Sequence, residues 1–189
     1  MDILGTLLGS QNRVKILRLF FLNAEKIIEN KEISRRSKVL PAALRREISI
    51  LSKISFIKKK SLGKLKGWQI NPAFPYLNLL RNLLLNSTAV SAEDLSKKLK
   101  VVGRIKLIII SGIFIQNNDS RVDLLVVGDF IKKNKIEKTV KDIEAIVGKE
   151  LKYAFFDTDE FLYRLGIYDK FVRDILDYPH EKILNKLNI

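Results

Sequence analysis

Cysteine is absent from this chain of 189 residues, and histidine occurs once, at His180. Without thiols the chain can form neither a disulfide framework nor a thiolate metal site. A single imidazole cannot by itself build a histidine-rich metal site. The sequence therefore predicts no bound metal and no cofactor. We expect His180, which follows Pro179, to be a surface residue.

Long apolar runs are also lacking. A membrane-spanning helix needs roughly 20 apolar residues, whereas the longest run here, residues 107–115, is interrupted by Ser111 and Gly112. The first residues of the chain carry neither the basic start nor the apolar run of a secretory signal. We therefore expect a cytoplasmic protein that has no membrane partner.

Acidic residues are scarce in the first part of the chain. Residues 1–72 hold 16 Lys+Arg and 5 Asp+Glu, a balance of +11, and residues 73–189 hold 19 and 16, a balance of +3; the two give the +14 of the whole chain. A positive field concentrated in one segment attracts polyanions, because each neutralised phosphate releases counterions. Ordinary solvated lysines explain the same asymmetry, so the charge alone leaves both interpretations open.

Residues 1–72 have the pattern of a winged helix-turn-helix. The apolar periodicity predicts helices over residues 10–23, 31–38 and 41–53. The runs 56–60 and 67–71, joined by a turn that contains Gly63, predict a β-hairpin with a basic tip. In a winged helix the third helix enters the major groove of double-stranded DNA and the hairpin lies along the backbone.

The third helix is the one expected to read bases. Leu44, Ile48 and Leu51 fall on one face, which leaves Arg45 and Arg46 outside. Arginine bonds guanine edges or phosphates, and small neighbours let a helix approach DNA closely. The predicted DNA-binding residues are Arg35 and Arg36 on the second helix, Ala42, Arg45, Arg46 and Ser49 on the third, and Lys58, Lys59, Lys60, Lys64 and Lys66 on the hairpin.

The stretches GSQNRVKILRLFFLN and LPAALRREISILSK resemble winged-helix transcriptional regulators of the ArsR-like type. The likeness covers residues 1–72 and implies a regulator that binds double-stranded DNA. The metal sensing of ArsR-like proteins does not carry over, because this chain has no cysteine. The alternatives are that the basic surface is merely solvated, or that the winged helix contacts another protein.

The rest of the chain is expected to form a helical linker, residues 73–98, and a second domain, residues 99–189. Leucines are dense in residues 74–85, over a face broad enough to pack on two sides, as in an interdomain or dimer helix. We therefore expect a homodimer. Beyond residue 99 strands and helices alternate, so the predicted fold class is a two-domain α+β or α/β protein. The strands are expected over 105–115, 122–127 and 151–156, and the helices over 131–147, 158–165 and 169–176.

One stretch of the second domain, SGIFIQNNDSRVDLLVVGD, resembles the core of the nucleotidyltransferase fold, and LKYAFFDTDEFLYR is similar to its later strand and helix. The likeness spans residues 101–176. Active members hold Mg²⁺ on a nucleotide with two carboxylates one residue apart on a strand. Here Arg121 stands at the first carboxylate position and Asp123 at the second, and Ser111-Gly112 reverses the family's Gly-Ser order. The resemblance therefore implies a domain that is catalytically degenerate.

The degenerate pocket leaves several functions open. Its expected residues are Ser111, Gly112, Ser120, Arg121, Asp123 and Asp157, the last as the remnant of a third acid. Arg121 and Asp123 form a simple surface salt bridge in one interpretation; in the other, Arg121 binds a nucleotide or another anionic ligand that changes DNA affinity. The sequence thus predicts a non-enzymatic, sequence-specific DNA-binding regulator whose second domain serves dimerisation or ligand sensing. The alternatives are an active small nucleotidyltransferase that holds its substrate or partner with the winged helix, and a structural adaptor that uses the leucine-rich helix.

Overall fold

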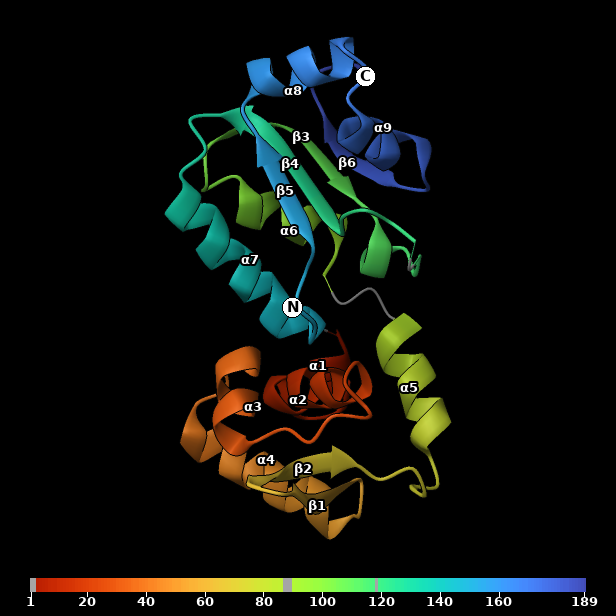
Figure 1. Cartoon of the computed structure of the whole chain (residues 1–189). Coiled ribbons are helices and arrows are strands. Elements are labelled where there is room, and N and C mark those ends of the chain that lie inside the picture. The colour runs from red at the N-terminus through yellow and green to blue at the C-terminus, as the bar shows by residue number, and fades with distance from the viewer. Residues whose placement is uncertain (1–2, 87–89, 118) are drawn as a thin grey trace. The chain divides into compact units, whose positions relative to one another are not determined.

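The computed structural model describes residues 3–86, 90–117 and 119–189 (Figure 1). Residues 87–89 of the expected linker and Asn118 of the nucleotidyltransferase-like stretch lie outside the described residues. The chain divides into two units: unit 1 is Met1–Val90 with Lys141–Lys149, and unit 2 is Ser91–Val140 with Glu150–Ile189. Each unit has helices and a sheet of its own, which confirms the predicted mixture of helix and strand.

Unit 1 consists of packed helices that are followed by a hairpin and a further helix (Figure 1). Its elements are α1 (Ile3–Leu7), α2 (Gln11–Phe21), α3 (Asn30–Ser37), α4 (Pro41–Lys53), β1 (Ile57–Leu62), β2 (Leu65–Ile70) and α5 (Leu77–Asn86). The three helices expected between residues 10 and 53 are confirmed, and α4 spans the expected residues. Helix α1 was not predicted, because its 5 residues are too few to display a helical repeat.

A buried carboxylate in α4 connects this helix to the start of α2. Ser10 caps α2 by accepting a hydrogen bond from the Arg13 amide, 3.1 Å away, and its hydroxyl donates to Glu47 Oε1 at 2.6 Å. The Arg13 Nε donates to Glu47 Oε2 at 2.9 Å. Glu47 is 6% exposed, so the ionised carboxylate depends on these two donors. With Glu47 turned inward, α4 packs through Leu44, Ile48 and Leu51.

The hairpin is longer and its turn tighter than the sequence predicted. Leu62 pairs with Leu65, which leaves a two-residue turn at Gly63 and Lys64 in place of a longer loop. Gly63 has a φ of 59°, a left-handed conformation that such turns need and that glycine adopts without steric cost. An antiparallel bridge between Ile28 and Trp68, with both N–O distances 2.9 Å, attaches the segment before α3 to β2.

Unit 2 contains a four-stranded mixed sheet in the order β5-β4-β3-β6. Its described elements are α6 (Ala92–Leu99), β3 (Arg104–Ile110), the 3₁₀ turn η1 (Gly112–Phe114), β4 (Leu124–Asp129), the first part of α7 (Lys133–Val147), β5 (Tyr153–Phe156), α8 (Thr158–Gly166), α9 (Lys170–Asp177) and β6 (Glu181–Asn185). β3 runs antiparallel to both β4 and β6, and β4 runs parallel to β5. Because antiparallel pairing predominates, the sheet places this unit in the α+β class.

Both faces of the sheet in unit 2 are covered. Phe161 of α8 and Val172 and Ile175 of α9 pack against Leu107 and Leu125 of the central strands. Figure 1 shows α6 behind the sheet, on the other face. The helices over 133–147, 158–166 and 170–177 confirm the expected pattern. No described helix is long and apolar enough to cross a membrane.

Two features of this sheet differ from the sequence predictions. The first strand ends at Ile110, although residues 105–115 were expected to continue it. Gly112 has a φ of 58°, which turns the chain out of the strand direction and into η1. The edge strand β6 was not predicted, because residues 181–185 lack the apolar alternation that identifies a strand. Its pairing with β3 joins segments that are far apart in the sequence and is not encoded locally.

Candidate functional site

The outer face of α4 presents the residues that were expected to read bases. Ala42, Arg45, Arg46 and Ser49 are separated by helical spacings of three and four, so they share one face. All four are exposed. Within the described ranges, neither Arg45 nor Arg46 has an acidic partner. The two guanidinium groups are therefore available to an external ligand.

The two arginines expected to assist from α3 differ in their surroundings. Arg35 is exposed. Arg36 is half-buried: its Nη1 lies 3.3 Å from Glu32 Oε1, and both Nη1 and Nη2 lie 3.4 Å from Asn23 Oδ1. The guanidinium of Arg36 is thus already engaged inside unit 1, and Arg35 is the more accessible of the pair.

The hairpin lysines expected to contact phosphates are all exposed, and the strand pairing divides them between two faces. Lys58 stands opposite Gln69 and Lys60 opposite Gly67, whereas Lys59 stands opposite Trp68. Alternate residues of a strand point to opposite faces, so Lys59, Lys66 and Trp68 share one side of the hairpin. The Lys59 Nζ lies over the Trp68 ring, 5.6 Å from the ring centroid.

The cations of α4 and the hairpin are not neutralised from within residues 1–72. Among the acidic residues of that segment, Glu47 is bound to Arg13 and Glu32 to Arg36. Several cations of unit 2, in contrast, are paired with carboxylates. Its ion pairs include Lys106 with Asp129, Arg121 with Asp174, Arg164 with Glu160 and Arg173 with Asp177. The cations of α4 and the hairpin therefore form an uncompensated positive surface on unit 1.

A pocket that was not predicted from the sequence lies beside the hairpin. It is about 700 Å³ in volume and is lined by residues of the α3 start and of both hairpin strands. The lining residues are Glu29, Asn30, Lys31, Lys59, Lys60, Ser61, Lys66, Gly67 and Trp68. The one signal in the sequence was a tryptophan placed among lysines in the predicted hairpin. The contribution of Asn30 and Lys31 depends on tertiary contacts.

Four of the residues expected in the degenerate nucleotide pocket lie close together, namely Ser111, Gly112, Ser120 and Asp123. Their polar groups are used in hydrogen bonds within the protein. Asp123 Oδ1 accepts from the Ile113 amide at 2.9 Å, and Asp123 Oδ2 accepts from the Lys152 amide at 2.8 Å. Ser120 Oγ accepts from the Gly112 amide at 3.0 Å, and the Ser111 hydroxyl donates to the Val122 carbonyl. Both carboxylate oxygens of Asp123 thus hold backbone segments together.

Two expectations about this pocket are wrong. Arg121 does not pair with Asp123; its Nε donates to Asp174 Oδ2 in α9 at 2.8 Å, because the carboxylate of Asp123 already accepts two amides. Asp157 does not approach Asp123 either. Leu124 stands beside Tyr153 and Val127 beside Phe156, so Asp123 and Asp157 lie at opposite ends of the parallel pair, five residues or roughly 17 Å apart at 3.3 Å per residue.

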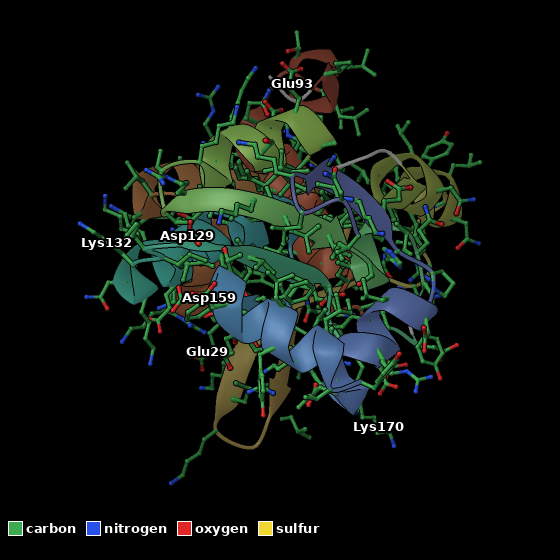
Figure 2. All side chains as sticks on the ribbon, turned by 90° about the horizontal axis from the view of Figure 1, so that it is seen from above. Glu29, Glu93, Asp129, Lys132, Asp159 and Lys170 are labelled. Atoms are coloured by element: carbon green, nitrogen blue, oxygen red, sulfur yellow. The ribbon has the colours of Figure 1, made fainter. Side chains whose placement is uncertain are left out.

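A second acidic residue of unit 2, Asp129, was also missed. It ends β4, where the Thr158 hydroxyl at the start of α8 donates to it and the Lys106 Nζ lies 2.9 Å from its Oδ2. These contacts, the Thr158 hydrogen bond first and the Lys106 ammonium next, hold the pKa of Asp129 below its ordinary value of 3.8. Figure 2 shows Asp129 and Asp159 on the same side of unit 2. Among the described residues, no group of three or more His, Asp or Glu side chains could hold a metal ion.

Comparison of the chain with models of known families, with curated proteins and with solved structures finds no match. Any function assigned to the chain therefore rests on the geometry and the charge of its two units.

Removing the Asp123 carboxylate should destabilise unit 2. We expect Asp123→Ala to lower its unfolding free energy by about 1.5–3 kcal/mol, because two backbone amides lose a charged acceptor. Asp123→Asn should lower the unfolding free energy of unit 2 by less than Asp123→Ala does, since the amide keeps one acceptor oxygen. Amide hydrogen exchange in β4 and β5 measures the change. Asp119→Ala, an exposed position in the same loop, is the matched control. Unchanged or greater protection in Asp123→Ala would show that the carboxylate has no structural role.

Acid stability of unit 2 should depend on Thr158. The pKa of Asp129 is lower in the folded state, so its carboxylate stabilises the fold above the ordinary pKa, and this contribution is lost as the pH falls through the folded-state value. Thr158→Val removes the first cause of the shift and should raise the pKa of Asp129. Titration of the carboxyl carbon by NMR measures it, with Lys170→Met as a control distant in sequence. A pKa that stays where it was would assign the shift to Lys106 instead.

Proposed function

We propose that this chain is a sequence-specific regulator of transcription that binds double-stranded DNA through unit 1. The observation that carries the proposal is the outer face of α4, where Arg45 and Arg46 are exposed and have no acidic partner among the described residues. A helical face of this kind, followed by a hairpin rich in lysine, fits a winged helix-turn-helix with α4 as the reading helix and β1–β2 as the wing.

Each part of this surface has a distinct role in the proposal. Arg45 and Arg46 form bidentate hydrogen bonds to guanine edges, and Ala42 and Ser49 allow α4 to approach the groove closely. Lys58 and Lys64 on the hairpin hold phosphates, which adds affinity without sequence preference. Arg35 assists from α3. The guanidinium of Arg36 supports the fold through Glu32 and Asn23.

We propose that unit 2 is a nucleotidyltransferase-like module that no longer catalyses and that serves dimerisation or ligand sensing. A metal-dependent site needs carboxylates whose oxygens are available to the ion. In unit 2 both oxygens of Asp123 accept backbone amides, and the position two residues earlier is Arg121. This hydrogen-bonding pattern favours a structural role for Asp123 over an active small nucleotidyltransferase.

A homodimer through α5 is part of the proposal. Leu77, Leu80 and Leu84 face the core of unit 1. Leu79 is 69% exposed and Leu83 is 44% exposed, one turn apart on the outside of the helix. Exposed leucines at this spacing are suited to pack against the same helix of a second copy, and a twofold dimer fits paired half-sites on DNA.

Selection from random duplexes with the purified full chain tests the proposal. We expect an enriched motif, and we expect Arg45→Ala or Arg46→Ala to weaken binding to that motif by about 1–3 kcal/mol while affecting a scrambled duplex less. Lys64→Ala should weaken both duplexes alike and reduce the slope of log affinity against log salt by about 1. Lys170→Ala, an equal loss of charge in unit 2, is the control. Recovery of no motif, or equal losses on both duplexes for both arginine variants, would overturn sequence-specific reading by α4.

The dimer is tested separately by analytical ultracentrifugation. A Leu79→Asp/Leu83→Asp variant should sediment as a monomer at concentrations where the parent chain is a dimer, because charged side chains cannot be buried without a partner. Asn82→Asp places the same charge on another exposed position of α5 and should leave the dimer intact. A parent chain that is monomeric at every concentration would remove the homodimer from the proposal.

A further inference from the structure

The pocket beside the hairpin is built by close contacts that fix its aromatic wall. Trp68 is held by its backbone bridge to Ile28 and by a hydrogen bond of 2.9 Å from its Nε1 to Asn30 Oδ1. Gly67 permits this approach, since a Cβ at that position would lie 2.5 Å from the Ile28 carbonyl oxygen. The indole therefore has one orientation, half-buried and facing the pocket from β2.

The charge of the pocket is strongly positive. Four lysines and one carboxylate line it, namely Lys31, Lys59, Lys60, Lys66 and Glu29. All four lysines are exposed, and within the described parts of the chain none of them has a carboxylate partner. Figure 2 shows Glu29 beside the hairpin. Glu29 is also the N-cap residue of α3, and its side chain makes no capping hydrogen bond, so the positive end of the helix adds to the field.

The combination of an aromatic ring and several ammonium groups selects a particular ligand chemistry. Lysine ammonium groups bind phosphates as point charges. A tryptophan ring beside them offers a stacking surface for a planar base. The Lys59 ammonium lies over the ring in a cation–π contact, and the lysine side chain is flexible. A bound phosphate can therefore attract the ammonium away from the ring and leave the ring face open to a base. A volume of about 700 Å³ is within the range of small-ligand sites.

We propose that this pocket binds one nucleotide, with the base against Trp68 and the phosphate between Lys31 and Lys66, because Lys66 shares the hairpin face of Trp68. The nucleotide is either a free mononucleotide or one unit of a single strand, since both present an unstacked base with a phosphate. Paired bases inside a duplex cannot reach the ring. The proposal goes beyond duplex binding by α4 and does not require it.

Trp68 makes the test direct, because it is the only tryptophan of the chain. The full chain is titrated with adenosine 5′-monophosphate, adenosine, inorganic phosphate, a short oligothymidylate and a blunt duplex, while the tryptophan emission is followed at an excitation wavelength that bases do not absorb. We expect saturable quenching by the monophosphate, and much weaker effects of adenosine and of phosphate alone.

Two charge variants locate the binding site. Lys66→Ala should weaken the binding of adenosine 5′-monophosphate by about tenfold. Lys26→Ala, which removes the same charge from the exposed loop before Ile28 and outside the pocket, should leave the binding unchanged. An Arg45→Ala/Arg46→Ala variant should also retain the quenching. That variant therefore separates a failure of this proposal from a failure of duplex reading.

The outcomes discriminate among the sources of the ligand. Quenching by the monophosphate assigns the site to free nucleotides. Quenching by oligothymidylate alone assigns it to single strands. Either result supports a nucleotide pocket. Equal quenching by inorganic phosphate overturns the role of the base. Quenching by the duplex alone assigns the pocket to the duplex-binding surface and overturns the proposal, as does no quenching by any probe or an equal loss of affinity in Lys66→Ala and Lys26→Ala.

Discussion

The carboxylate of Glu47 is the constraint on which the surface of unit 1 depends. It lies on the inner side of α4, where water is excluded, and it is satisfied by the Ser10 hydroxyl and the Arg13 guanidinium at the start of α2. A buried charge that lost these donors would destabilise the fold strongly. Because Glu47 must face α2, its neighbours Arg45 and Arg46 must face the solvent. The rotation of α4 about its axis is therefore set by an ionic contact as well as by leucine packing.

The two units use charge in opposite ways. In unit 1 Glu47 and Glu32 pair with Arg13 and Arg36, and the lysines and arginines of α4 and the hairpin are left to the solvent. In unit 2 several cations are paired with carboxylates, and Asp123 is bound by two backbone amides. Most of the net positive charge of the chain therefore lies in unit 1, and this unit is the one expected to attract a polyanion.

The hairpin combines two kinds of surface because its strands have two faces. Lys58 lies on one face, and Lys59, Lys66 and Trp68 lie on the other. The bridge to Ile28 pairs that segment with the free edge of β2, and Asn30 at the start of α3 then bonds the indole at the side of the pocket. A single β-hairpin can therefore present phosphate-binding lysines to the solvent and also form the wall of a site for a small ligand.

Local patterns in the sequence were sufficient to predict most of the elements. Pro41, the apolar repeat of α4 and the cap residue Ser10 determine where α4 and α2 begin, so these two helices were predicted closely. The exposure of Arg45 and Arg46 followed from the same repeat. Such features depend on neighbours three or four residues away, which a single sequence displays.

Tertiary structure alone decided the contacts between distant segments. The pairing of β6 with β3, the ion pair of Arg121 with Asp174 and the placement of Asn30 beside Trp68 each join residues that are tens of positions apart. The sequence by itself determined where the helices begin and which residues are cationic. Only the folded chain determined which of those charges are neutralised, because partners are chosen by packing and not by proximity along the chain.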